Sequence, residues 1–334
     1  MILFESGNIE AAFYFSAEEY IIKILKPEEL VLMLWSTGDT VMIGANQIIK
    51  AEINEAYVKK AGIDIVRRAS GGGTIFTDRK TLQYTIILKH NEDSQNNDPK
   101  AVMKEWLAEP LIRALSTMGV SASLEGRNDV TLDGKKISGL AQYVRNGYMC
   151  RHGSLLYDTD LEKLSKTLTV DREKIKSKAI ASVNARVAKI ADHLKDKKDL
   201  PTFREALIES YGQKEPIERK EFTKEELKTI EDIKSERFGN ESWTYGHEPE
   251  FTYTNKKRFP GGAIEVFLDV KGGEIKTASI KGDFLALRPV SDIEEGLIGV
   301  AHRENALREA LHSLDVESAL GSLTEKELLE TLVG

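Results

Sequence analysis

The chain has 334 residues, 41% hydrophobic and 30% charged, which is enough for two globular domains with a charged surface. Its net charge of −7 argues against a general nucleic-acid-binding protein, which needs a basic surface. The single cysteine, Cys150, excludes an intrachain disulfide and predicts a reducing, cytoplasmic location. No apolar run is long enough to span a membrane, and the N-terminus lacks the basic start of a signal peptide.

The first part of the chain is predicted to combine short strands with helices. Apolar spacing and flanking Gly, Pro and Asp residues predict helices over 9–25, 53–61, 100–118 and 161–168, and strands over 30–35, 39–44, 82–88 and 153–157. Pro110 implies a kink or a break in the third helix. Asp133-Gly134 predicts a hairpin turn between two further strands. Because strands and helices do not alternate regularly, we expect an α+β domain with a mixed or antiparallel sheet.

The composition changes near residues 243–246, after two predicted helices over 201–211 and 223–235. Beyond this point, alternating residues predict a hairpin over 262–270 and 275–280, and helical patterns follow over 301–314 and 324–332. The segment 213–220 is expected on the surface. We therefore predict a larger domain over residues 1–245 and a second, smaller α+β domain over residues 246–334.

The stretch Arg67-Arg68-Ala69-Ser70-Gly71-Gly72-Gly73 follows a predicted strand, and Thr74-Ile75-Phe76 begins another apolar run. Each glycine costs about 0.5–1 kcal/mol in chain freedom relative to alanine, so three together indicate a demanding backbone path. Two interpretations remain open: a plain loop between strands, or a cradle in which backbone N–H groups and a guanidinium bind an anion. The stretch is neither a P-loop nor a G-x-G-x-x-G motif.

A second informative stretch runs from Gly126 to Gly139. Asn128 and Asp129 can offer an amide and a carboxylate to a nucleobase, a metal or a ribose. Lys136 lies on the return strand of the predicted hairpin, where its ammonium either binds an acyl carboxylate or a phosphate or is simply solvated.

In order along the chain, these motifs resemble lipoate–protein ligase A over nearly the whole length. The motifs are Arg67-Arg68-x-Ser-Gly-Gly-Gly, Gly126-Arg-Asn-Asp129, Asp133-Gly-Lys-Lys136-Ile-Ser-Gly, His152-Gly153, Ser182-Val-Asn-Ala-Arg-Val187, Trp243-x-Tyr-Gly, Arg258-Phe, Gly-Gly-x-x-Glu265 and Gly282-Asp-Phe284. The resemblance implies a catalytic domain of the biotin/lipoate ligase type. It also implies a two-step reaction, in which lipoate and ATP give lipoyl-AMP and a carrier lysine then accepts the lipoyl group.

The resemblance also implies roles for individual residues. The expected ATP and lipoyl-AMP contacts are Arg68, Ser70, Gly71, Gly72, Gly73, Thr74, Ile75, Phe76, Asn128, Asp129 and Lys136, and the expected lipoate contacts are Lys136, Gly73, Ser138 and His152. Lys136 is the expected catalytic residue, and Asp129 is the expected Mg²⁺ ligand. The dithiolane tail needs an apolar slot, for which residues near Ile43, Ile75 and Leu140 are candidates.

The implied partners are lipoyl carrier proteins: the glycine-cleavage H-type carrier and the acyltransferase subunits of 2-oxoacid dehydrogenases. We expect a monomer that binds neither nucleic acid nor a membrane. Several positions depart from the usual family residues, namely Thr74, Thr77, Lys80-Thr81 and Asn184. These departures leave substrate preference and carrier choice open. They do not affect the predicted reaction class.

Three alternatives are related by fold. An octanoyl or lipoyl transferase would work without ATP through a cysteine nucleophile, for which only Cys150 is available. A biotin ligase would have a different arginine-glycine loop. An inactive carrier-binding protein would lack Lys136 or Arg68, and both are present. The predicted C-terminal domain also favours the ATP-dependent ligase.

Overall fold

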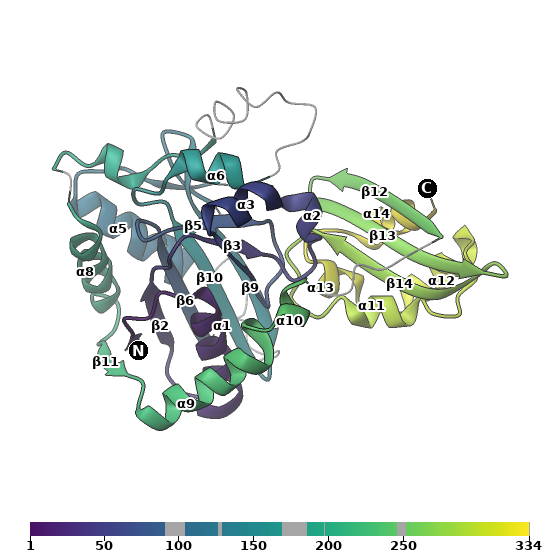
Figure 1. Cartoon of the computed structure of the whole chain (residues 1–334), viewed down its shortest axis with the longest axis horizontal. Coiled ribbons are helices and arrows are strands. Elements are labelled where there is room, and N and C mark those ends of the chain that lie inside the picture. Colours follow the sequence, from purple (N-terminus) through teal and green to yellow (C-terminus); the bar gives the residue numbers. More distant parts are fainter. Residues whose placement is uncertain (91–103, 126–128, 169–185, 197, 246–251, 334) are drawn as a thin grey trace.

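The structure, a computed structural model, describes residues 1–90, 104–125, 129–168, 186–196, 198–245 and 252–333. A mixed sheet organises the larger part, with the strand order β11-β1-β2-β6-β10-β9-β8-β7 (Figure 1). Its strands are β1 (Ile2–Glu5), β2 (Val31–Trp35), β6 (Leu82–Lys89), β7 (Ser123–Glu125), β8 (Asp129–Leu132), β9 (Lys135–Arg145), β10 (Tyr148–Leu155) and β11 (Glu218–Glu221). Strand β1 runs parallel to both of its neighbours, and the other pairs are antiparallel.

Helices cover both faces of this sheet because its central strands bury alternate residues on each side. On β2, Leu32 and Leu34 pack with α5 (Glu109–Thr117) and α8 (Leu200–Gly212). Val31, Met33 and Trp35 pack on the opposite face with α1 (Ala11–Tyr20) and α9 (Lys224–Ile233). The face under α1 is the one that contributes to the site described below.

A second, three-stranded sheet carries the glycine-rich loop. Its order is β4-β3-β5, with β3 (Thr40–Ile43) between β4 (Asp64–Arg67) and β5 (Ile75–Thr77). Short helices α2 (Ile49–Glu52), α3 (Glu55–Ala61) and α6 (Leu161–Thr167) belong to this region. The predicted helix end at Gly62 is confirmed by its left-handed φ of 64°. The glycine-rich loop joins two strands, as the sequence predicted.

The last part of the chain forms a smaller unit with its own apolar core. An antiparallel sheet of β12 (Tyr253–Phe259), β13 (Gly262–Lys271) and β14 (Glu274–Gly282) packs with α11 (Ser291–Gly296), α12 (Glu304–His312), α13 (Val316–Leu320) and α14 (Glu325–Val333) (Figure 1). We call residues 252–333 the C-terminal domain. A smaller α+β C-terminal domain is therefore confirmed, whereas the boundary at 245/246 stays a prediction because residues 246–251 lie outside the described part.

Some elements differ from the expectations. The predicted helix over 9–25 consists of α1 and a π-helical turn, Ile21–Leu25, and ends at Lys26 with φ 49°. The break expected at Pro110 is the start of α5, which follows another π-helical turn, Lys104–Ala108. The sequence did not predict β1, β11, β12 or the short helix α10 (Glu241–Tyr245). Among the described residues, no helix is long and apolar enough to cross a membrane.

Candidate active site

A cavity of about 640 Å³ lies where the large sheet, the glycine-rich loop and the C-terminal domain meet. Apolar side chains form much of its wall, among them Phe15, Trp35, Met42, Ile75, Phe76 and Leu140. Polar groups from the predicted site residues also line it, namely Arg68, Lys136, Ser138 and His152. The cavity thus offers an apolar slot together with fixed cations, the combination needed by a fatty carboxylate that must be activated.

Most predicted site residues come together in this cavity. Besides the four polar residues, its wall includes Gly72, Gly73, Thr74, Ile75 and Phe76. Ser70 and Gly71 are not part of the wall, and Asn128 lies outside the described residues, as do residues 182–185. Of the slot candidates, Ile75 and Leu140 line the cavity, but Ile43 packs into a separate core cluster. Its neighbour Met42 faces the cavity instead, because adjacent residues on a strand point to opposite faces.

Lys136 is held near the start of β9 by the hairpin that precedes it. Asp133 and Gly134 both have positive φ, 49° and 72°, as the tight hairpin turn predicted from the sequence requires. The Lys136 Nζ lies 2.7 Å from Asp129 Oδ1 on the partner strand β8. The end of its side chain also lies over Gly139, where an added Cβ would be 2.9 Å from both Cε and Nζ. The hairpin turn, the ion pair with Asp129 and the lack of a side chain at Gly139 together place the Lys136 ammonium at the cavity.

Arg68 holds the glycine-rich loop in shape. Its Nη2 donates to the carbonyls of Gly71 and Gly73, at 2.8 Å each, and its Nη1 donates to Met42 O at 3.0 Å. Burial, together with the adjacent Arg67, lowers the pKa of Arg68 to about 10, so the guanidinium stays charged at neutral pH. In this structure these N–H groups bind main-chain carbonyls, so Arg68 stabilises the conformation of the loop. Its contact with a nucleotide stays a prediction.

The C-terminal domain docks on the glycine-rich loop, on the turn after β3 and on β9 through main-chain hydrogen bonds. Gly72 N donates to Phe284 O at 3.0 Å, Gly282 N donates to Asn46 O at 2.9 Å, and Val144 N donates to Leu287 O at 3.2 Å. One loop N–H that the anion-cradle interpretation assigned to a ligand therefore binds a carbonyl of the C-terminal domain. An added Cβ on Gly71 would lie 2.5 Å from Phe284 O, so this glycine permits the close approach.

The C-terminal domain also contributes residues to the cavity that sequence reasoning did not name as site residues. Arg258 and Asp283 line its wall and pair with each other, with Nη2 and Oδ2 3.0 Å apart. Both occur in motifs that carried the family resemblance. Their presence in these motifs was the one indication in the sequence that the two residues have a function. The fold is needed to show that they reach the cavity.

Comparison with known proteins decides the family. Residues 10–212 match the model of the lipoyl protein ligase A/B catalytic domain, and residues 248–332 match that of the bacterial lipoate protein ligase C-terminus. The chain belongs to the lipoate-protein ligase family. It is an enzyme of the ligase class. This ligase is 35% identical over 336 residues to lipoate-protein ligase LplJ of Bacillus subtilis, an alignment that covers 99% of this chain and 100% of the relative. It is also 32% identical to lipoate–protein ligase 1 of Staphylococcus aureus, with 94% of each chain covered.

Solved structures confirm the fold of the ligase. P. falciparum LipL1 in complex with lipoate is similar over 100% of this chain and 99% of its own, with a TM-score of 0.78 and 22% identity. A bipartite lipoate protein ligase of Thermoplasma acidophilum, studied with its E2 lipoyl domain, has a TM-score of 0.65 and 25% identity over 75% of this chain and 98% of its own. A lipoate-protein ligase A bound with ATP has a TM-score of 0.61 and 23% identity over 73% of this chain and 98% of its own.

Cys150, the nucleophile of the transferase alternative, is fully buried on β10 and is not part of the cavity wall. Burial, reinforced by the nearby Glu18, raises the pKa of the Cys150 thiol well above its ordinary value. A reactive cysteine needs the opposite, a stabilised and accessible thiolate. The geometry therefore argues against a transferase that uses this thiol.

Arg67, the other arginine of the pair, is a structural residue of the ligase. Its Nε donates to Thr244 O at 2.8 Å, and its Nη1 donates to the carbonyls of Gly44 and Gln47 at 2.8 and 2.7 Å. Trp243 Nε1 in turn donates to Arg67 O at 2.8 Å. Arg67 thus fastens α10, the last described element before the C-terminal domain, to the turn that follows β3.

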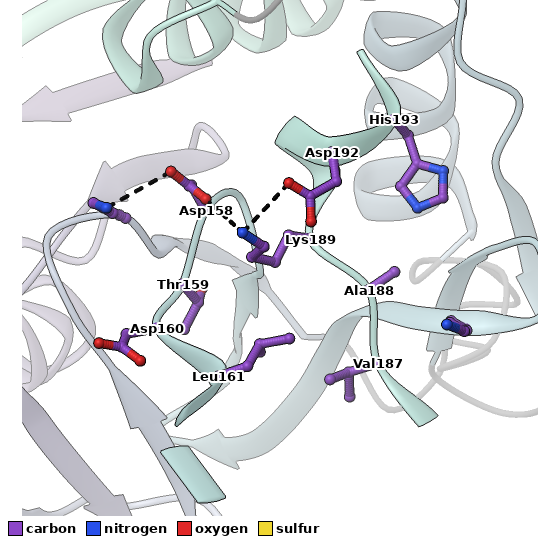
Figure 2. Close-up of a pocket in the computed structure, with 11 residues that line it drawn as sticks. Asp158, Thr159, Asp160, Leu161, Val187, Ala188, Lys189, Asp192 and His193 are labelled. Atoms are coloured by element: carbon purple, nitrogen blue, oxygen red, sulfur yellow. Dashed lines mark hydrogen bonds and ion pairs between the residues drawn. The ribbon is translucent and has the colours of Figure 1, made fainter. Parts of the chain in front are cut away.

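A second hollow of about 550 Å³ lies next to residues 187–189, the segment that flanks Lys136 (Figure 2). In Figure 2, Lys189 points between Asp158 and Asp192, with its Nζ 2.9 and 3.3 Å from their carboxylates. Ala188 N donates to Lys136 O at 3.0 Å, and Val187 lines both cavities. Lys80 also pairs with Asp158, with its Nζ 3.7 Å from Oδ2, so two lysines face the two carboxylates and hold the segment beside Lys136.

Proposed function

We propose that the ligase activates lipoate with ATP to form bound lipoyl-AMP and pyrophosphate, and then transfers the lipoyl group to a lysine of a carrier domain. One observation carries the proposal: a single cavity joins an apolar slot to Lys136 and the glycine-rich loop. Relatives studied with lipoate, with ATP and with a lipoyl domain support the choice of substrates.

In the first step, a carboxylate oxygen of lipoate attacks the α-phosphorus of ATP. The bond from that phosphorus to the bridging oxygen breaks, and pyrophosphate leaves. Negative charge from the carboxylate and the polyphosphate must be brought together, which is unfavourable unless a cation lies between them. We assign this task to the Lys136 ammonium, which can donate to both the acyl oxygen and the α-phosphate.

In the second step, the neutral amine of the carrier lysine attacks the acyl carbon of lipoyl-AMP. The bond between that carbon and the phosphate oxygen breaks, AMP leaves, and the new amide nitrogen releases a proton to solvent. Lys136 polarises the acyl carbonyl without forming a covalent intermediate. The apolar wall holds the dithiolane tail, with Trp35 and Leu140 as contacts.

Mg²⁺ is proposed to enter as the MgATP substrate. Asp129 fits it, because Mg²⁺ is commonly held by one or two carboxylates together with substrate phosphates. Asp129 is not part of the cavity wall and its Oδ1 is buried against Lys136, but its side chain is partly exposed, so its other oxygen would face a nucleotide bound beside Lys136. The metal would neutralise charge on the departing pyrophosphate.

The first test is lipoate-dependent exchange between ATP and labelled pyrophosphate. Wild-type protein should exchange label only when lipoate is present, and Lys136→Ala should abolish the exchange with little change in melting temperature. Lys135→Ala is the matched control, because Lys135 is the adjacent residue and lines the other hollow. Exchange by Lys136→Ala at the wild-type rate would refute the assignment, and an inactive wild type would refute the function.

A second test identifies the acceptor. We propose that the partners are the glycine-cleavage H-type carrier and the acyltransferase subunits of 2-oxoacid dehydrogenases, and that the ligase acts as a monomer. A panel of apo-carriers incubated with lipoate and ATP should show the mass increase of one lipoyl group on one lysine. Replacing lipoate by octanoate in the same assay measures the acyl preference, and a carrier panel without any mass increase would overturn the transfer step.

A further inference from the structure

Four buried side chains form a continuous hydrogen-bonded chain, two of them in the cavity wall and two behind it. Glu18 on α1 contacts His152 Nδ1 on β10, with its Oε1 and Oε2 at 2.9 and 3.1 Å. His152 Nε2 lies 2.5 Å from Ser70 Oγ, and Ser70 Oγ accepts from Arg68 Nε at 3.0 Å. Glu18 and Ser70 are 0% and 1% exposed, and neither is part of the cavity wall. The chain therefore runs from α1 to the arginine that shapes the glycine-rich loop.

The donors and acceptors of the four side chains can all be satisfied at once. Arg68 Nε–H can only donate, so Ser70 Oγ accepts from it, and the Ser70 hydroxyl can donate its own hydrogen to His152 Nε2. The imidazole then carries its proton on Nδ1, where it donates to the Glu18 carboxylate. Every polar atom in the chain is satisfied, which is what fixes side chains in a dry interior.

Glu18 is the fixed end of this chain because other groups also hold it. Its Oε1 accepts from Thr85 Oγ1 at 2.8 Å, and Thr85 Oγ1 accepts from Trp35 Nε1 at 3.1 Å. Trp35 belongs to the apolar wall of the cavity. The Glu18 carboxylate thus contacts two sets of hydrogen bonds. One passes through Thr85 to Trp35 in the apolar wall, and the other passes through His152 and Ser70 to Arg68.

We propose that Glu18, His152 and Ser70 act as positioning residues that orient Arg68 and, through it, the glycine-rich loop that faces Lys136. The inference rests on the proposed function, since it concerns the same cavity. Arg68 Nη2 holds Gly71 O and Gly73 O, so a rotation of its guanidinium moves the loop backbone. Reacting groups that are misplaced by about 1 Å can lose about 100-fold in rate, so a small rotation is sufficient.

Glu18→Gln tests the chain with almost no change in shape. One of the two oxygens facing His152 Nδ1–H becomes an NH₂ group, and two donors then face each other. We expect the rate of lipoate-dependent pyrophosphate exchange to fall at least about tenfold. Glu19→Gln is the matched control, because Glu19 is buried on the same helix but pairs with Arg237 and Arg145 instead. It should keep the wild-type exchange rate.

A spectroscopic measurement separates positioning from loss of packing. The Arg68 Nε–H resonance in ¹H–¹⁵N spectra should shift in Glu18→Gln, although Glu18 does not touch Arg68, and should stay unchanged in Glu19→Gln. If Glu18→Gln does not fold, Ser70→Ala removes a single oxygen from the chain and should show the same two effects. A wild-type exchange rate in Glu18→Gln, or a slow variant with an unmoved Arg68 resonance, overturns the inference. A wild type without exchange overturns the proposed function, while the resonance still decides whether the chain exists.

Discussion

Gly139→Ala tests whether the exact position of the Lys136 ammonium matters. The added Cβ would lie 2.9 Å from Lys136 Cε and Nζ, and no other atom lies as close. Carbon atoms in good contact are about 3.5–4.0 Å apart, so the end of the lysine must move by about 0.6–1 Å. The change meets only the far end of a flexible side chain, so the fold should tolerate it. Replacement of glycine by alanine in a compatible conformation can even stabilise a protein by about 0.4–1 kcal/mol.

The expected loss appears in catalysis and not in stability. A displacement of about 1 Å predicts a loss of about 100-fold in the exchange rate. That loss corresponds to about 2.7 kcal/mol of transition-state stabilisation. Pyrophosphate exchange measures the rate, and thermal unfolding should give a melting temperature at or above that of the wild type.

Two controls make the Gly139 result decisive. Gly38→Ala adds a Cβ with no atom within 4 Å, so it should leave activity unchanged and stability at or above that of the wild type. The double variant Lys136→Ala/Gly139→Ala should exchange pyrophosphate no more slowly than Lys136→Ala alone, because the effects of two changes that act through one group are not additive. If Gly139→Ala exchanges pyrophosphate as fast as Gly38→Ala, the position of the ammonium is not what the enzyme requires.

Three further predictions address the thiol, the domain junction and a half-buried carboxyl. Cys150→Ser should keep full exchange and transfer, and folded wild type should resist alkylation at Cys150, because burial keeps the thiol protonated; loss of transfer alone would revive the transferase alternative. Gly71→Ala should separate the C-terminal domain from the loop by its clash with Phe284 O, seen as a larger radius of gyration in X-ray scattering, and an unchanged profile would contradict this. Burial and Asp283 raise the pKa of Glu52, so its ionised form destabilises the fold at pH 7 and this penalty disappears as pH falls through the raised pKa. Glu52→Gln should therefore raise the melting temperature at neutral pH, with a gain that shrinks on acidification, and a pH-independent gain would count against this account.

Local chemistry explains why the sequence predicted that Lys136 lies on the return strand of a hairpin. The Asp133-Gly134 turn allows few backbone conformations, and it fixes the register of the two strands that flank it. The glycine-rich loop was likewise found from composition alone, since consecutive glycines are costly elsewhere. In both cases the determining residues are close together in the chain.

Partners from distant parts of the chain could not be predicted in this way. Arg68 binds Met42 O, and Gly72 binds Phe284 O, although nothing in the local sequence names either carbonyl. Glu18 is one of two acidic residues in the helix α1, and its contact with His152 spans 134 positions. The strand β11 was missed because its four side chains are exposed, so it shows no apolar alternation.

The main-chain hydrogen bonds that attach the C-terminal domain to the rest of the enzyme have a consequence for how the enzyme can change over evolutionary time. Gly72, Gly282 and Val144 each supply a peptide N–H, a group that every amino acid except proline possesses. Substitutions can therefore accumulate at Val144 without removing its bond, whereas Gly72, with a φ of 88°, and Gly282, where an added Cβ would lie 2.2 Å from Ala263 O, must stay glycine. Correlated mutations, which report compensating side chains, would leave little record of such a contact, and descendants could retain the junction after their sequences had diverged.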